Sequence, residues 1–182
     1  MTILHIDSSI SGENSASRRL TRSIVGQVKS AAGGEIVYRD LAADPLPHLT
    51  LDAFADTAVL DEFLAADTVV VGAPMYNFTL PTQLKAWIDR LAVAGRTFRY
   101  TDKGPEGLVK NKRVIVALAR GGFYGVGSPA AALEHLETYL RGIFNFIGVE
   151  PEFVAADGLA IGPEQREQSI SDALGETLRL AA

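Results

Sequence analysis

The sequence predicts a doubly wound α/β fold, in which a parallel sheet is covered by helices on both faces. Five short apolar runs rich in β-branched residues indicate buried strands, and segments with helical periodicity alternate with them. The chain has 182 residues, enough to bury one sizeable core and too few for two comfortable ones. We therefore expect one domain over residues 1–182, with right-handed crossovers and the strand order 2-1-3-4-5.

The expected strands are short and mostly apolar on both faces. They cover Ile3 to Ile6, Ile36 to Tyr38, Thr68 to Val71, Val114 to Leu118 and Phe153 to Ala156. Apolar residues three and four positions apart predict the helices. The stripes are Leu20, Ile24 and Val28; Leu84, Ile88 and Leu91; Leu133, Leu136, Leu140, Ile143 and Ile147; and Ile170, Leu174 and Leu178, with one more helix over Asp61 to Ala66. The segments Ala42 to Leu51 and Gly95 to Lys112 are expected to be irregular.

The composition favours a small-molecule partner in a reducing compartment. A formal charge of −5 disfavours nucleic acid and anionic membranes, because their phosphates attract basic surfaces. The chain has no cysteine, so any redox chemistry requires a bound cofactor. No basic leader or long apolar segment is visible, and we expect a cytoplasmic protein. The scattered His5, His48 and His135 show no ligand spacing, and no metal site is expected.

Ligands of doubly wound folds bind at the carboxyl ends of the strands, where the strand order reverses. The loop there from Ser8 to Ser17 is rich in serine and opens a helix. Unpaired N–H groups and hydroxyls suit a phosphate monoester, although Ser15 or Ser17 as an ordinary N-cap is the alternative. The loop has neither the glycine pattern of dinucleotide sites nor a P-loop lysine, which favours a single phosphate such as that of FMN. Arg18 and Arg19 are expected to be solvated.

Two further loops predict the walls of a pocket for a flat ring. After the third strand, Met75 to Phe78 lie between Pro74 and Pro81 and combine a thioether, two aromatic rings and an amide. After the fourth strand, Gly121 and Gly122 allow close approach of the backbone to a ligand. The alternatives are that the aromatic residues plug the top of the sheet and that the glycines serve a turn.

Several stretches carry a resemblance to a known family. They are Asp7-Ser8-Ser9 with Ser15-Ala16-Ser17, Ala73 to Phe78 continuing into Gln83-Leu84-Lys85, Gly95 to Thr101, Gly104 to Leu108, and Arg120-Gly121-Gly122. Over nearly the whole chain, the sequence resembles the FMN-dependent NADH azoreductases, flavodoxin-like homodimers that also reduce quinones. The resemblance implies a three-layer flavodoxin-like domain with non-covalent FMN, NADH or NADPH as electron donor, and a quinone or azo compound as acceptor.

The resemblance also implies which residues form the site. The FMN phosphate site consists of Ser9, Ser15, Ala16 and Ser17. The ring lies against one loop of Met75, Tyr76, Asn77 and Phe78 and another of Ala119, Arg120, Gly121 and Gly122. Tyr100 and Phe146 match aromatic residues that line the substrate side across the dimer interface. The resemblance also implies two hydride-level transfers through one site, which give ping-pong kinetics and need no catalytic side chain. Tyr124 is a candidate proton donor to the reduced acceptor, but water is the preferred one.

Two departures from the family pattern bear on substrate range. Ala119 stands where the family usually has a small hydroxyl residue, and the connection from Pro47 to Val59 is shorter than usual by roughly twenty residues. Two other functions stay open. An electron carrier without a nicotinamide substrate usually has an acidic face, and Arg96, Arg99 and Arg120 near the ring count against it. A non-enzymatic nucleotide- or partner-binding module would leave the aromatic loop and the paired glycines unexplained.

Overall fold

The computed structural model describes residues 1–181, and its centre is a parallel sheet of five strands in the order β2-β1-β3-β6-β7. All five expected strands are present. They are β1 (Thr2–Asp7), β2 (Glu35–Asp40), β3 (Thr68–Pro74), β6 (Arg113–Ala119) and β7 (Glu152–Ala156). The expected order 2-1-3-4-5 is confirmed, since β4 and β5 lie outside this sheet.

The burial of each strand agrees with its position in the sheet, and the register of the strands determines where the loops of the site begin. Every residue of β3 is buried, as its near-continuous apolar sequence requires for the middle of a parallel sheet, while β2 at the edge is largely accessible. The register sets Asp7 opposite Gly72 and Pro74 opposite Ala119. β3 and β6 therefore end level with each other, two residues beyond the end of β1, and the loops that follow the three strands open at one edge of the sheet.

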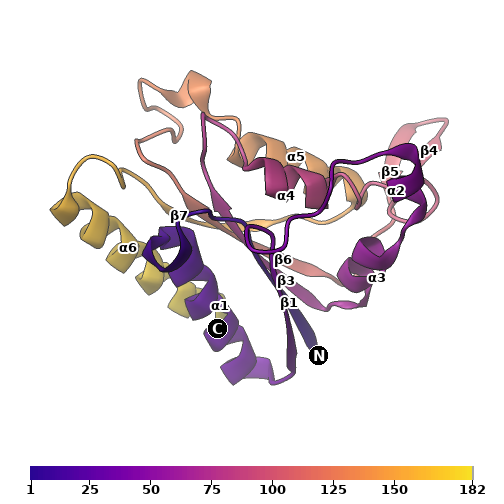
Figure 1. Cartoon of the computed structure of the whole chain (residues 1–182), viewed down its shortest axis with the longest axis horizontal. Coiled ribbons are helices and arrows are strands. Elements are labelled where there is room, and N and C mark those ends of the chain that lie inside the picture. The colour runs from indigo at the N-terminus through magenta and orange to yellow at the C-terminus, as the bar shows by residue number, and fades with distance from the viewer. Residues whose placement is uncertain (182) are drawn as a thin grey trace.

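Helices cover both faces of the sheet (Figure 1). On one face, α1 (Ala16–Ala32) and α6 (Pro163–Thr177) bury Leu20, Ile24 and Ile170. On the other, α3 (Ala58–Ala65), α4 (Thr82–Ile88) and α5 (Glu137–Ile147) bury a core that includes Phe63, Trp87 and Phe144. Each fully buried large apolar side chain contributes roughly 1.5–3 kcal/mol to this packing. Among residues 1–181, no helix combines the length and hydropathy that crossing a bilayer requires.

Some helix boundaries differ from the expected ones. The helix expected from Leu133 begins at Glu137, and Leu133 lies in the short 3-10 helix η2 (Ala131–Leu133). The cause is the carboxylate of Glu134, which accepts the N–H groups of Glu137 at 2.7 Å and Thr138 at 2.9 Å and so caps a later start. Leu91 lies beyond the end of α4, and Leu178 begins the 3-10 helix η3 (Leu178–Ala181).

The two segments expected to be irregular differ in outcome. Residues 42–50 form no helix or strand, as expected, and a short helix begins at Leu51. The helix expected over 61–66 is confirmed as α3, which starts earlier, at Ala58, and follows the short α2 (Leu51–Ala55). The segment 95–112, however, contains an antiparallel hairpin of β4 (Phe98–Thr101) and β5 (Gly104–Gly107). Its glycines permit a close backbone contact, because a Cβ on Gly107 would lie 2.2 Å from the nitrogen of Gly148. The hairpin and the segment that follows β6 lie at opposite ends of the molecule (Figure 1).

Candidate functional site

The loops at the carboxyl ends of the strands enclose a cavity of about 110 Å³. It is lined by Ser9, Ser11, Asn14, Ser15, Ala16, Pro74, Met75, Tyr76, Ala119, Leu159 and Arg166. The structure thus brings together residues from each of the three loops that the sequence singled out. Of the other expected site residues, Asn77 lines a neighbouring cavity of about 330 Å³, and Arg120 lies beside a third of about 470 Å³, which Tyr124 also lines.

The serine loop both caps α1 and lines the cavity. The Ser15 hydroxyl accepts the N–H of Arg18 at 3.3 Å, as an N-cap does, and its oxygen lies 3.1 Å from that of the fully buried Ser17. Ser9 Oγ accepts the N–H of Ser11 at 3.2 Å and lies 3.3 Å from the Tyr76 hydroxyl. The first N–H groups of a helix have no carbonyl partner inside it. Capping and anion binding are therefore compatible functions of this loop.

Arg18 supports the serine loop from below. Its side chain is buried, with 6% of the residue exposed, so the expectation that it is solvated was wrong. It donates to the Ser9 carbonyl at 2.9 Å, to both carboxylate oxygens of Asp40 at 2.6 and 2.8 Å, and to the Tyr38 hydroxyl at 3.1 Å. The hydrogen bond from Arg18 lowers the pKa of Asp40. The guanidinium is thereby committed to holding the loop.

Asp7 completes this network beneath the loop. It accepts hydrogen bonds from Thr21 Oγ1 at 2.9 Å and the Tyr38 hydroxyl at 3.1 Å, and His5 Nε2 lies 3.4 Å away. Burial acts to raise the pKa of Asp7, but contacts with His5 and Thr21 and the charge of Arg18 outweigh it and lower the pKa. Burial, with the charges of Asp7 and Asp40, raises the pKa of Tyr38 to about 12. An ionised carboxylate that already accepts these hydrogen bonds is suited to hold the serine loop in position and not to transfer a proton.

The aromatic loop contains a tight turn. Tyr76 and Thr79 exchange backbone hydrogen bonds of 2.9 and 3.1 Å, and the two residues between them have positive φ, +47° at Asn77 and +72° at Phe78. This is the pattern of a type I′ turn, which asparagine tolerates and phenylalanine adopts only under strain. Phe78 is 41% exposed and meets the ring of Tyr124 edge to face, with centroids 6.1 Å apart. It does not plug the top of the sheet.

A fourth segment, which the sequence reasoning missed, lies against the glycine loop. The N–H groups of Gly158, Leu159 and Ala160 donate to the carbonyls of residues 122, 120 and 121 at 3.1, 3.1 and 2.9 Å. A Cβ at Gly121 would lie 3.3 Å from that of Ala160, and one at Gly122 equally close to the Tyr124 ring. These glycines therefore allow close packing within the chain. Leu159 carries no motif that could have identified it.

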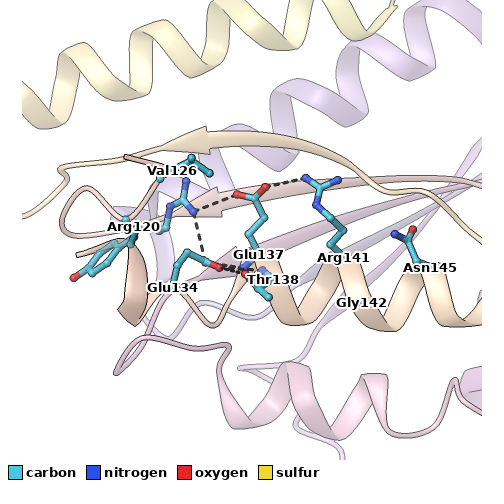
Figure 2. Close-up of a pocket in the computed structure, with 11 residues that line it drawn as sticks. Arg120, Val126, Glu134, Glu137, Thr138, Arg141, Gly142 and Asn145 are labelled. Carbon is cyan, nitrogen blue, oxygen red and sulfur yellow. Dashed lines mark hydrogen bonds and ion pairs between the residues drawn. The ribbon is translucent and has the colours of Figure 1, made fainter. Parts of the chain in front are cut away.

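Arg120 is the buried centre of a cluster of charges beside the third cavity (Figure 2). It is 3% exposed and donates to both carboxylate oxygens of Asp157, at 2.6 and 3.0 Å. Glu137 and Glu134 lie 3.3 and 3.6 Å from its Nη1, and Arg141 pairs in turn with Glu137 at 2.9 Å. Burial acts to lower the pKa of Arg120, but the contacts with these carboxylates outweigh burial and raise the pKa. The cavity beside it presents a compensated set of charges.

Contrary to the expectation from the sequence, Arg96, Arg99 and Arg120 do not count against an electron carrier. Besides the compensated Arg120, Arg96 pairs with Asp61 at 2.7 Å, and Arg99 pairs with Glu106 at 2.7 Å. No side chain of this group offers an unpaired positive charge to a ring. The choice between carrier and enzyme depends on other evidence.

Tyr100 and Phe146 meet in an aromatic cluster away from the cavity. The ring of Phe98 lies 5.5 Å from that of Tyr100 and 4.6 Å from that of Phe146. Tyr100 is 75% exposed. The hairpin that carries it is at the opposite end of the molecule from the segment following β6 (Figure 1), so these rings do not line the cavity of their own chain. Within residues 1–181, acidic and histidine side chains form no candidate metal centre.

Comparisons with known proteins agree with this geometry. A family model described as a flavodoxin-like fold matches residues 1–180. An FMN-dependent NADH:quinone oxidoreductase of Rhizobium meliloti (strain 1021) is 55% identical over 207 positions, and one of Bradyrhizobium diazoefficiens is 52% identical over 201, each match covering 100% of both chains. The crystal structure of an azoreductase from Bacillus anthracis strain Sterne matches with a TM-score of 0.90 and 30% identity, covering 100% of this chain and 98% of that one.

The chain is shorter than these relatives. The Bradyrhizobium alignment spans 201 positions and this chain has 182 residues, so it lacks a residue at about 19 of them (201 less 182). That difference is of the size expected for the shortened connection from Pro47 to Val59. In the structure this connection contains the short α2, residues on either side of it that form no helix or strand, and the first two residues of α3.

Proposed function

The chain belongs to the flavodoxin-like family of the FMN-dependent NADH:quinone oxidoreductases, and we propose that it is itself a single-domain, three-layer FMN-dependent NAD(P)H oxidoreductase that reduces quinones and azo compounds. One observation carries the proposal. A serine loop suited to one phosphate and a proline-framed loop suited to a flat ring line the same cavity at the carboxyl edge of the sheet. The absence of cysteine accords with action in the cytoplasm.

The residues present fit FMN. Ser9 and Ser15 are buried hydroxyl donors beside the free N–H groups of α1, a set that recognises a phosphate monoester without lysine. Pro74, Met75 and Tyr76 provide apolar and aromatic surface for a ring. Ala119 adds a methyl group in place of a hydroxyl, and its carbonyl accepts the N–H of Met75 at 2.8 Å, which ties the two ring loops together.

The mechanism places the redox chemistry on the cofactor and the positioning on the protein. Bound FMN supplies hydride-level transfer from NAD(P)H to the acceptor. Ser9 and Ser15 would hold the phosphate end, with Ser17 beside the Ser15 hydroxyl at 3.1 Å, and Met75 with Tyr76 would orient the ring. Asn77, at the tip of its turn, offers an amide to polar ligand edges. No side chain acts as a nucleophile, and water supplies the proton to the reduced acceptor in preference to Tyr124.

Donor and acceptor that use one site in turn give ping-pong kinetics. The test measures initial rates over a grid of NADH and soluble quinone concentrations. Parallel double-reciprocal lines are expected. Intersecting lines would require both substrates to be bound together and would contradict a single shared site.

We extend the proposal to a homodimer in which the cluster of Phe98, Tyr100 and Phe146 covers the partner's site. Its support is the exposure of Tyr100 at the end of the molecule away from the cavity of its own chain. Two inactive variants test it, Gly122→Trp and the double substitution Tyr100→Ala, Phe146→Ala. Their heterodimers contain one intact composite site and should regain part of the activity. Heterodimers that form and stay inactive would refute a cover supplied in trans.

The two alternative functions give different spectra. A purified protein whose visible spectrum lacks flavin bands, and stays unchanged when FMN is added, would be a binding module of another kind. A flavoprotein that NADH bleaches only very slowly under anaerobic conditions would be an electron carrier. Rapid bleaching, followed by reoxidation on addition of a quinone, is the result expected here.

A further inference from the structure

Arg166 reaches the serine-lined cavity from the last long helix of the fold. It lies in the first turn of α6, where its backbone N–H donates to the Gly162 carbonyl at 2.9 Å. Its side chain lines the cavity, and Nη2 donates to the carbonyl of Asn14 at 2.7 Å. Asn14 ends the 3-10 helix η1 (Gly12–Asn14), which leads directly into the N-cap Ser15. The guanidinium is thus placed at the phosphate end of the cavity.

The charge of Arg166 is uncompensated in the described part of the chain. The other arginines near the site all have carboxylate partners within ion-pairing distance: Arg18 with Asp40 at 2.6 Å, Arg19 with Glu167 at 3.2 Å, Arg22 with Glu13 at 2.8 Å and Arg120 with Asp157 at 2.6 Å. Within residues 1–181, Arg166 makes no ion pair and its side chain makes one hydrogen bond, to a neutral carbonyl. A guanidinium has five N–H donors, so four remain for a ligand.

We propose that Arg166 binds the terminal phosphate of FMN and supplies the positive charge that the serine loop lacks; this inference rests on the proposed function. Hydroxyl and backbone N–H groups bind a phosphate dianion through neutral donors alone. A guanidinium adds charge-assisted hydrogen bonds in a planar arrangement that matches two phosphate oxygens. Arg120, which is buried beside another cavity, cannot serve an anion in this way, because Asp157, Glu137 and Glu134 already surround it. Figure 2 shows the contacts with the two glutamates.

The alternative is that Arg166 only ties α6 to the end of η1. The two readings differ in what they predict for riboflavin, which has the ring of FMN and no phosphate. A phosphate ligand affects FMN alone, whereas a structural tie that shapes the cavity affects both flavins.

The experiment titrates apo-protein with FMN and with riboflavin and follows flavin fluorescence. In Arg166→Gln, the Kd for FMN should rise about 10- to 100-fold, the range for one charge-assisted contact, and that for riboflavin should not change. Arg166→Lys should recover part of the loss, and the salt dependence of FMN binding should flatten in Arg166→Gln. Arg19→Gln is the matched control. It also removes one positive charge, but from an exposed ion pair with Glu167, the residue that follows Arg166 in the chain.

Four outcomes would overturn the inference. Equal weakening of FMN and riboflavin binding in Arg166→Gln would make the residue a structural tie, and an unchanged FMN affinity would remove it from the phosphate site. A wild-type protein that binds both flavins equally well would show that the phosphate is not recognised, while the proposed function would stand. A wild-type protein that binds neither flavin would refute the proposed function together with the inference.

Discussion

Replacing Arg18 by methionine should destabilise the protein strongly, because two carboxylates beneath the serine loop lose their counter-charge. Removing one partner of a buried ion pair costs about 3–5 kcal/mol. The Asp40 side chain is 21% exposed and keeps the N–H groups of Ala42 and Ala43, which favours the lower end of that range. A loss of about 3 kcal/mol is large against the 5–15 kcal/mol by which domains are stable.

The assay is urea unfolding of the apo-protein, followed by far-UV circular dichroism. A cycle with Asp40→Asn isolates the pair, and the double variant should be more stable than the sum of the single effects predicts by about 1–3 kcal/mol. Arg22→Met is the matched control one turn along α1, since Arg22 makes two hydrogen bonds of 2.9 and 2.8 Å to Glu13. That pair is largely exposed, so its midpoint should not move measurably.

The comparison of Arg18→Met with Arg22→Met tests whether burial causes the loss of stability. Both make bidentate contacts from the same helix, and burial is the main difference between them. If the urea midpoint of Arg18→Met moved no further than that of Arg22→Met, burial would not be the source of the effect. The same result would mean that the Ser9 carbonyl holds its position without the guanidinium.

Three further predictions concern the serine loop, the aromatic turn and the response to acid. Ser15→Asp keeps a good N-cap while setting a charge against the phosphate, and a repulsion of ~2 kcal/mol should weaken FMN binding about thirtyfold in a fluorescence titration; an unchanged Kd would exclude the loop from the site. Phe78→Gly removes left-handed strain of roughly 1–2 kcal/mol, so its Tm should equal or exceed that of the wild type, whereas Phe78→Val should lower it; equal Tm values for the two variants would argue against strain. The pKa values of Asp7, Asp40 and Glu134 are lowered by folding from ordinary values of 3.8, 3.8 and 4.5, so the stability they contribute is complete above these values and is lost as the pH falls through the folded values. Thermal unfolding between pH 7 and 3 should show Tm falling below about pH 4.5, and a constant Tm would contradict this.

The parallel sheet could be predicted because its information is local. β3 reads as a continuous apolar run, and a strand buried on both faces has no other composition. The loops at its carboxyl edge followed from the strand order, and three of them do line the cavity. What the sequence could not give are contacts made by side chains far apart in the chain. Asp40 follows Arg18 by 22 residues, and no pattern around Arg18 marks it as buried.

The boundaries that were wrong have the same origin. The apolar stripe continues through Leu133, yet the carboxylate of Glu134 sets the start of α5 after it. The hairpin of β4 and β5 depends on contact with the end of α5, which the glycine-rich sequence of β5 does not reveal. Leu159 and Arg166 reach the cavity from beyond the last strand, where neither composition nor spacing distinguishes them from surface residues.

The contact of Gly107 with Gly148 has a genetic consequence. Gly148 has a φ of +101°, and a Cβ at Gly107 would lie 2.2 Å from its nitrogen, so a single added methyl group would displace the hairpin and Tyr100 with it. The cavity of the altered chain would remain intact, and that chain would still bind its own flavin. In the proposed dimer, the site left uncovered belongs to the other subunit. In a mixed dimer, an allele with alanine at position 107 would therefore impair the site of the unaltered chain, while the altered chain kept every residue that binds the cofactor and the cover that its partner supplies.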